Sequence, residues 1–249
     1  MSTFDLYDVN CRIGRFPWGE VGDESADPLL RRMDRFGIAR ALVSHTASWR
    51  HDPATGNDLI VRVVADHPRL RPCWVAVPGT CAELAAPEQF VRDALRCDVG
   101  AIRVYPDEHG FDLDSAEFGG YLGAFEQAGL PVIVDLAATS WAAIDAVAAA
   151  HPDLALIVCE IGYRVLRRAA AVLERHANVF LDLSDLSSHE GLEWLCQRFG
   201  PGRLIFGTGA PLRDPGEAVT RLLWSDLDAG AVSRIASSTL CELVPGGVR

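Results

Sequence analysis

Acidic, basic and imidazole side chains stand at the ends of apolar segments along this sequence, where they could act together in chemistry. The residues that could transfer protons are Asp135, Glu160, His45 and Asp182. The residues that could hold a substrate are Asn10, Arg12, Arg103, His109 and His189. Carboxylates and imidazoles serve as general acids and bases, and guanidinium groups bind carboxylates through paired hydrogen bonds. These residue types predict a site for a small anionic molecule, of the carboxylate type.

The same acids raise the question of a metal ion. Asp135 and Glu160, with Asn10 or Asp182 as a third ligand, offer hard oxygen ligands, which suit Mg²⁺ or Mn²⁺ better than zinc. Arg12 is expected in the same cluster, and its fixed positive charge competes with a cation. We therefore expect no metal and no cofactor, with the charge of Arg12 balancing Asp135 and Glu160. Oxygen-bound Mg²⁺ or Mn²⁺ is the alternative.

Eight short apolar runs, separated by amphipathic segments, are the elements that must position these residues. The expected strands are residues 6–13, 40–44, 70–77, 100–105, 131–136, 155–160, 179–183 and 204–207. The expected helices are residues 28–36, 58–65, 87–95, 121–127, 141–150, 164–175, 190–199 and 217–224. Continuous apolar runs are typical of parallel strands that helices cover on their outer face. Eight such units in 249 residues predict a single-domain (β/α)8 barrel, an α/β fold, over residues 1–249.

In such a barrel, the active site lies at the carboxyl ends of the strands. The candidate residues fall at or just after these ends. Residues 46–57 are the longest expected connection, and we expect this loop to lie over the barrel mouth with Trp49. Asp8 is expected to cap backbone groups at the rim, and alternation along the strand should turn Cys11 toward the helices.

Bulk properties exclude several classes of protein. A net charge of -11 argues against a nucleic-acid partner, because a phosphate-binding face needs clustered Lys and Arg. No apolar run is long enough to span a membrane, and no secretory signal is expected. The 7 cysteines include no CxxC pair, which predicts reduced thiols and a cytoplasmic location. A homo-oligomer remains compatible with all of these features.

Four segments carry a resemblance to a known family. They are Asp8-Val-Asn10-Cys-Arg12, Pro131-Val-Ile-Val-Asp135, the stretch from His151-Pro to Glu160-Ile-Gly162, and Arg203-Leu-Ile-Phe-Gly-Thr-Gly209-Ala-Pro211. The chain resembles the amidohydrolase-related superfamily of metal-dependent hydrolases over its whole length. The resemblance implies a TIM barrel. Where that family carries metal ligands, this sequence has Asn10, Arg12, Asp135, Glu160 and Gly209, so the implied metal chemistry is in doubt.

Three functions follow as hypotheses. The first is a hydrolase that acts on a small carboxylate through a degenerate, metal-free site. The second is a non-catalytic relative that binds a ligand or serves as a scaffold. The third is a Mg²⁺- or Mn²⁺-dependent hydrolase or decarboxylase with oxygen ligands. Burial of Arg12 against carboxylates with no free volume would favour the second.

Overall fold

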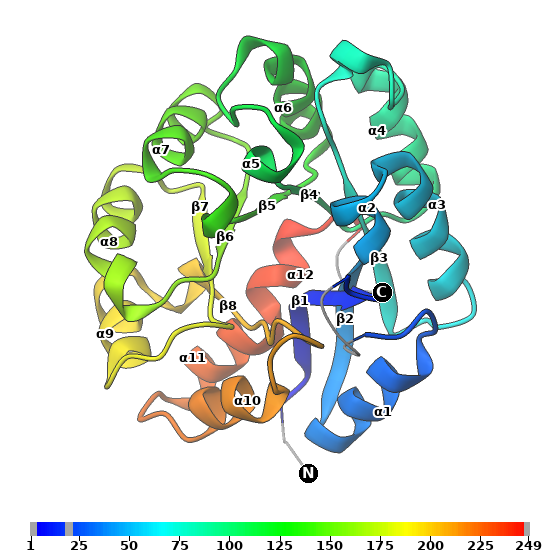
Figure 1. The fold of residues 1–249 in the computed structure, drawn as a ribbon. Helices are drawn as coiled ribbons and strands as arrows, with labels where there is room; N and C mark the ends of the chain where they lie inside the picture. The colour runs from blue at the N-terminus through cyan, green and yellow to red at the C-terminus, as the bar shows by residue number, and fades with distance from the viewer. Residues whose placement is uncertain (1–3, 18–21, 247–249) are drawn as a thin grey trace.

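A parallel sheet of eight strands, in sequence order, forms the centre of the molecule (Figure 1). The computed structural model describes residues 4–17 and 22–246. The strands are β1 (Leu6–Ile13), β2 (Ile38–His45), β3 (Leu70–Val75), β4 (Ala101–Val104), β5 (Val132–Asp135), β6 (Leu156–Cys159), β7 (Val179–Asp182) and β8 (Leu204–Ile205). Backbone bonds from Val9 N to Phe206 O (3.1 Å) and from Arg12 N to Ala210 O (2.9 Å) join β1 to the segment after β8. The sheet is therefore a nearly closed barrel, which confirms the predicted fold class.

Helices alternate with the strands and cover the outside of the barrel. The larger ones are α1 (Asp27–Phe36), α3 (Pro53–Val64), α4 (Pro87–Arg96), α6 (Ala116–Ala128), α7 (Trp141–Ala150), α8 (Leu166–Arg175), α9 (Gly191–Phe199) and α10 (Pro215–Leu223). Shorter helices are α2 (Thr46–Arg50), α5 (Pro106–His109), α11 (Ala229–Ser233) and α12 (Thr239–Leu243), with a π-helical turn at Arg234–Ser238. Several helices have proline in the first turn, where its missing N–H costs no hydrogen bond.

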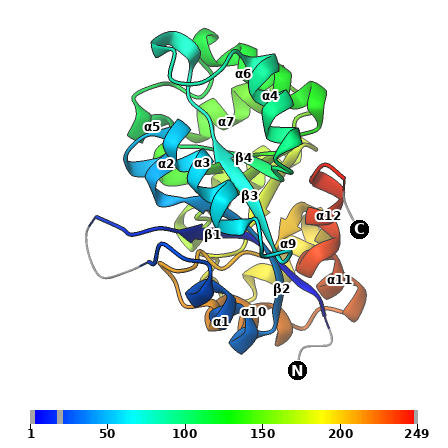
Figure 2. The same cartoon turned by 90° about the vertical axis from the view of Figure 1, so that its right-hand side faces the viewer.

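The two ends of the barrel are closed by different elements (Figure 2). Inside the barrel, Val9, Leu42, Ile133 and Ile157 form an apolar cluster that also contains Leu240 of α12. Helix α12 thus closes the end at which the strands begin. Helices α2 and α5 lie on the opposite side, over the carboxyl ends of the strands. A larger apolar core lies between the sheet and the outer helices. The interior is therefore packed at one end, and polar groups gather at the other.

The prediction that residues 46–57 form a long connecting loop is wrong, because most of them are helical. The side chain of His45 accepts a hydrogen bond from Ala47 N and caps α2. The side chain of Asp52 accepts one from Thr55 N and caps α3, whose expected start at residue 58 was too late. Capping side chains of this kind supply partners that the first helical N–H groups otherwise lack. The segment still lies at the barrel mouth, as expected.

Two residues of α3 fix the position of α2 over the mouth. A Cβ added at Gly56 would lie 2.1 Å from Ser48 N, so glycine is required for α2 and α3 to pack this closely. The buried amide of Asn57 donates to Val75 O (2.8 Å) and accepts from Val75 N (2.8 Å). Asn57 thereby satisfies the backbone of β3 as a neighbouring strand would. Helix α2, with Trp49, is held in place by these contacts.

Within the part of the chain that the structure describes, no helix is both long enough and apolar enough to cross a membrane.

Candidate functional site

Two arginines share one carboxylate at the carboxyl ends of the barrel strands. Arg12 of β1 donates from Nη2 to Asp135 Oδ2 (2.6 Å), and Arg103 of β4 donates from Nη1 to Asp135 Oδ1 (2.8 Å). All three are buried, with exposed fractions of 5%, 1% and 4% for Arg12, Arg103 and Asp135. Both oxygens of Asp135 are therefore occupied by guanidinium groups. We call Arg12 and Arg103 the guanidinium pair.

Asn10 connects the guanidinium pair to a second buried acid. Its Oδ1 accepts from Arg103 Nη2 (2.9 Å) and Arg12 Nη1 (3.2 Å), and its Nδ2 donates to Asp182 Oδ2 (2.9 Å). Asp182 also accepts from the hydroxyl and the backbone N–H of Ser184. Burial raises the pKa of Asp182, and the hydrogen bonds from Ser184 and Asn10 partly offset this effect. A continuous hydrogen-bond network thus crosses the barrel from β4 to β7.

An irregularity in β1 brings Asn10 and Arg12 to the inside. The register between β1 and β2 shifts between Asp8 and Cys11, and Val9 packs in the inner cluster beside Asn10. A bulge of this kind re-aims the side chains that follow it. Cys11 packs in the outer core, as predicted, and its Sγ donates to Asp8 Oδ2 (3.0 Å).

Asp8 holds the seam between β1 and β8. Its Oδ1 accepts from Asn10 N (2.9 Å) and Thr208 N (3.0 Å), and its Oδ2 accepts from the Thr208 hydroxyl. The prediction that Asp8 caps backbone groups is confirmed. Burial raises the pKa of this carboxyl, and the hydrogen bond from Thr208 offsets part of the rise.

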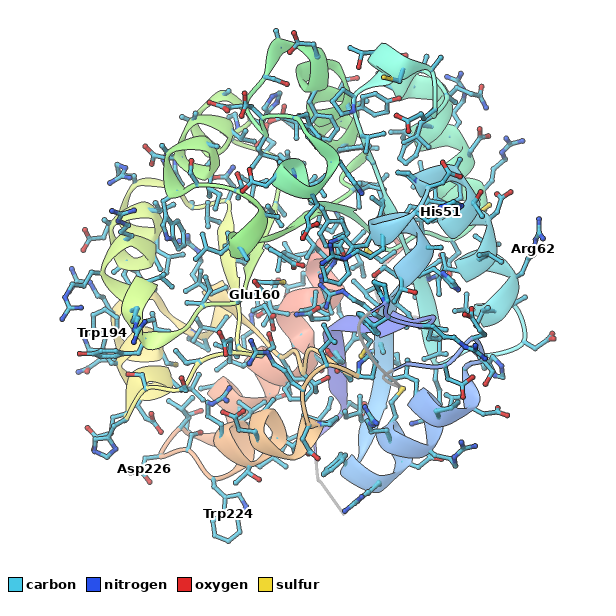
Figure 3. All side chains as sticks on the ribbon, viewed as in Figure 1. His51, Arg62, Glu160, Trp194, Trp224 and Asp226 are labelled. Carbon is cyan, nitrogen blue, oxygen red and sulfur yellow. The ribbon has the colours of Figure 1, made fainter. Side chains whose placement is uncertain are left out.

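Glu160 lies beside the network without being bonded into it. Figure 3 shows Glu160 near the centre of the ring of helices. Among the described residues it forms no ion pair, so the direct pairing expected between Arg12 and Glu160 is not made. Its φ of 65° places the backbone in the left-handed region, an unfavourable conformation that is often found at functional sites. Burial raises the pKa of Glu160; the charge of Asp135 adds to this, and Arg12, Arg103 and Arg213 act against it.

Aromatic rings pack against the guanidinium group of Arg12. Trp49 of α2 stacks on Tyr105 with ring centroids 5.1 Å apart, and the Cζ atom of Arg12 lies 5.2 Å from the centroid of Trp49. Arg12 Nε donates to the Tyr105 hydroxyl (3.3 Å). His109 lies 2.9 Å from Trp49 O through Nε2, which must carry the proton because a carbonyl only accepts. Its buried Nδ1 has no hydrogen-bond partner, and burial lowers the pKa of this imidazole.

The other two predicted histidines lie outside the network. The ring of His45 is buried, caps α2 through Nδ1 and lies 3.5 Å from Glu24 through Nε2. Burial lowers the pKa of His45, and Glu24 opposes this shift. The side chain of His189 is 94% exposed and belongs to a surface depression that Trp194 also lines, at the rim of the molecule in Figure 3. The structure thus brings together Asn10, Arg12, Arg103, Asp135 and Asp182, with Glu160 and His109 beside them.

Arg213 is a mouth residue that the sequence did not reveal. It pairs with Asp185 (2.7 Å), and a Cβ added at Gly209 would lie 3.1 Å from its Cδ. It therefore folds back across the end of β8, toward Glu160. Next to Arg12, a pocket of about 310 Å³ opens between the end of β1, residues 22–29 and Pro211. The barrel mouth is thus filled by the network, but an accessible volume remains at its edge.

The donor set at this end of the barrel does not fit a divalent cation. No three His, Cys, Asp or Glu side chains gather closely enough to hold a metal ion in residues 4–17 and 22–246. The two oxygens of Asp135 already accept from guanidinium groups, whose charge cannot be removed at neutral pH. A cation would have to displace a buried positive charge before it could reach this carboxylate.

One family model and a set of solved structures match this chain. The model of the amidohydrolase family matches residues 7–239, so the chain belongs to the amidohydrolase family. No curated protein matches the chain. A 2,6-dihydroxybenzoate decarboxylase from Rhizobium is similar in structure, with a TM-score of 0.76, 13% identity, and coverage of 97% of this chain and 98% of that one.

Two further solved structures extend this likeness. One is a 5-carboxyvanillate decarboxylase from Novosphingobium aromaticivorans complexed with manganese (TM-score 0.76, 12% identity, coverage 97% and 96%). The other is described as a probable 2-pyrone-4,6-dicarboxylic acid hydrolase from Acinetobacter baumannii with citric acid bound (TM-score 0.70, 10% identity, coverage 96% and 99%). The chain thus belongs to the amidohydrolase family and shares its barrel fold with these solved structures.

Proposed function

We propose that this protein is an enzyme that acts on a small organic carboxylate and uses the guanidinium pair where related enzymes use a metal ion. The buried Arg12–Asp135–Arg103 cluster beside Glu160 is the observation that carries the proposal. Two guanidinium groups and one carboxylate leave a net positive charge in a region shielded from water. A fixed charge in such a site interacts strongly with any anion that forms nearby.

Glu160 is the group proposed to move the proton. Its raised pKa keeps more of the acid form available near neutral pH than an exposed glutamate would hold. In a decarboxylation, the bond from the ring carbon to the carboxyl group breaks, carbon dioxide leaves, and a proton takes its place on carbon. In a hydrolysis, the ionised form takes a proton from the attacking water. The names of the related decarboxylases and of the hydrolase support both reactions.

The substrate is proposed to enter by the pocket beside Arg12. There it would meet Arg12, whose guanidinium group offers a positive charge to a carboxylate. Trp49 and Tyr105 pack against the same guanidinium group behind the pocket lining, and their flat rings would suit a planar aromatic carboxylate bound to Arg12. His109 contributes an unprotonated Nδ1 on the other side of Tyr105, where the two rings are 5.8 Å apart.

Turnover in the presence of chelator tests this proposal. The purified protein would be incubated with EDTA and with 2,6-dihydroxybenzoate, 5-carboxyvanillate or 2-pyrone-4,6-dicarboxylate, and carbon dioxide or the ring-opened product would be measured. We expect metal-independent turnover of at least one compound, and a kcat lowered about 10²- to 10⁴-fold in Glu160→Gln. Glu174→Gln, on the exposed surface, is the control. Activity that appears only with added Mn²⁺, or a fully active Glu160→Gln, would refute the proposal.

A non-catalytic binding protein is the second candidate. The hydrogen bonds of Arg12 to Tyr105, Asn10 and Asp135 use each of its three nitrogens, as a purely structural cluster would. Calorimetric titration with the same compounds separates the two candidates. Binding without product over many hours would favour this reading over the enzyme.

A further inference from the structure

We infer that an arginine groove between α1 and residues 211–214, the segment that leads into α10, is the route by which small organic anions reach Glu160. The groove is lined by Arg31, Arg32 and Arg35 of α1 and by Arg213, and it has a volume of about 410 Å³. Helices α1 and α10 lie side by side in both views (Figures 1 and 2). The inference rests on the proposed function, because it names the path and the charge of the ligand for that same site.

The arginine groove continues into the pocket beside Arg12. Both are lined by Pro28, Arg32 and Pro211, so they adjoin at these three residues. Arg32 stands at the junction, and its Nη1 donates to Pro211 O (3.4 Å). The arginine groove and the pocket beside Arg12 are therefore neighbouring hollows with Arg32 between them, and on the proposed path the Arg32 side chain must move aside for a molecule to pass.

Both ends of this path act on Glu160. Arg12, in the inner pocket, and Arg213, in the outer groove, are among the charges that lower the pKa of Glu160 against its burial. Arg213 pairs with Asp185, and a Cβ added at Gly162, two residues after Glu160, would lie 3.4 Å from Asp185 Oδ2, so the outer groove ends close to the Glu160 segment. An anion that exchanges for Asp185 on Arg213 would come next to the proposed proton donor.

The charge of the path is opposite to that of the molecule. Five arginines line the two pockets, against two lining acids, Asp23 and Asp214; Asp135 and Asp185, which pair with Arg12 and Arg213, bring the net charge to +1. The chain as a whole carries -11. Both acids are engaged by backbone N–H groups, Asp23 with Ser25 N and Asp214 with Gly216 N. A positive groove in an acidic protein attracts anions to one place and repels them elsewhere.

Three of the arginines can meet an incoming anion. Arg31 and Arg35 are exposed, and neither forms an ion pair within residues 4–17 and 22–246. Arg213 has one ion pair, with Asp185, and its side chain is 40% exposed. By contrast, many other arginines of the molecule are paired with an acid on their own or a neighbouring helix. Arg31 and Arg35 thus offer two exposed guanidinium groups without an ion pair at the groove; among the described residues, Arg164 and Arg168 near the start of α8 also form no ion pair, which makes them a matched control.

Charge reversal at the entrance tests the inference. Arg31→Glu/Arg35→Glu would be compared with Arg164→Glu/Arg168→Glu, two exposed arginines at the same spacing near the start of α8. The probe is citrate, and the readout is the shift in Tm over NaCl of equal ionic strength, because a ligand that binds the folded state stabilises it. We expect citrate to raise the Tm of the parent and of Arg164→Glu/Arg168→Glu (the control pair) by the same amount. In Arg31→Glu/Arg35→Glu (the groove pair) the rise in Tm should be smaller by at least about half.

A kinetic measurement separates this inference from the proposed function. If a substrate is turned over, kcat/KM should fall about tenfold in the groove pair at low salt, with kcat unchanged and a weaker salt dependence. If citrate raises the Tm of all three proteins equally, or does not raise the Tm of the parent, the inference that the groove collects small anions is wrong. Loss of turnover in Glu160→Gln with citrate stabilisation intact would support both proposals. If no protein shows turnover but citrate changes the Tm values as expected, the anion-binding groove is supported and the proposed enzymatic function is refuted.

Discussion

Asp135 is the residue on which the charge balance of the barrel mouth depends. It is the buried counter-charge of both Arg12 and Arg103. Replacing it with asparagine would leave two buried guanidinium groups without a counter-ion, and breaking a buried pair costs about 3–5 kcal/mol. We expect Asp135→Asn to lose that much unfolding free energy in denaturant melts. The exposed pair of Asp145 gives the control, since Asp145→Asn should cost at most about 1 kcal/mol.

Arg12 should be less critical than Asp135, because Arg103 still neutralises the carboxylate when Arg12 is removed. From the sequence, Arg12 was expected to balance both Asp135 and Glu160, and Arg103 to pair with Asp135 or Asp182; the structure shows both arginines on Asp135. An Arg12→Met protein as unstable as Asp135→Asn would show that the two arginines are not interchangeable as counter-ions.

Glu160 gives the stability of the protein a pH dependence of known sign. Its pKa is raised in the folded state above the ordinary 4.5. The stability linked to its proton is therefore complete below about pH 4.5 and is lost as the pH rises through the folded-state pKa. We expect Glu160→Gln to gain unfolding free energy relative to the parent as the pH rises from 4 to 8. Denaturant melts across this range check it, and a constant difference would mean that the pKa is not raised.

The sequence predicted part of this site for a physical reason. Asn10, Arg12, Arg103, Asp135 and Asp182 are polar residues at the carboxyl ends of apolar strands. The period of a strand predicts the direction of Arg103, Asp135 and Asp182, whereas the irregularity in β1 that puts both Val9 and Asn10 inside was not predicted. His45 was placed correctly at a strand end, but its ring caps a helix that the pattern did not predict. Arg213 and His189 lie in loops, where no period relates sequence to direction. Arg213 was therefore missed, and His189, which lies in the loop after β7 as expected, is exposed and outside the network.

Among the elements, α3 has the most specific structural task. The side chain of Asn57 replaces a strand partner for Val75. Asn57→Leu would leave two buried backbone groups unpaired, each of which costs about 1–3 kcal/mol. We expect a loss of about 2–4 kcal/mol in thermal or denaturant melts. Asp58→Asn, at the next and exposed position, should change the unfolding free energy by no more than about 0.5 kcal/mol. Equal effects of the two substitutions would contradict this role for Asn57.

The elements themselves followed from hydrophobic patterning where that patterning is regular. The eight strands are continuous apolar runs, and each was found within a few residues of its bounds. Helix α2 and the start of α3 were missed because their positions depend on the capping groups of His45 and Asp52 and on a close contact at Gly56. The C-terminal helices were missed because the π-helical turn at Arg234–Ser238 breaks the 3.6-residue period that identifies a helix.

At the scale of the whole molecule, the sheet becomes a ring only through the seam between β1 and β8. β8 is two residues long, and the seam relies on Asp8 and Thr208 as much as on the backbone. These two residues are 200 positions apart in the chain. Contacts between such distant residues close late, because a long loop must be ordered before they form.

The seam should therefore govern how long the barrel stays folded. A contact that is absent from the transition state for folding affects the unfolding rate and leaves the folding rate almost unchanged. We expect Asp8→Ala to accelerate unfolding in denaturant jumps, while refolding from the unfolded chain keeps its parental rate. Slowed refolding would instead place the two ends of the chain together at an early stage. We therefore expect the barrel to unfold first by separation of β1 from β8, so that the hydrogen bonds of the Asp8 carboxylate determine the lifetime of the native state.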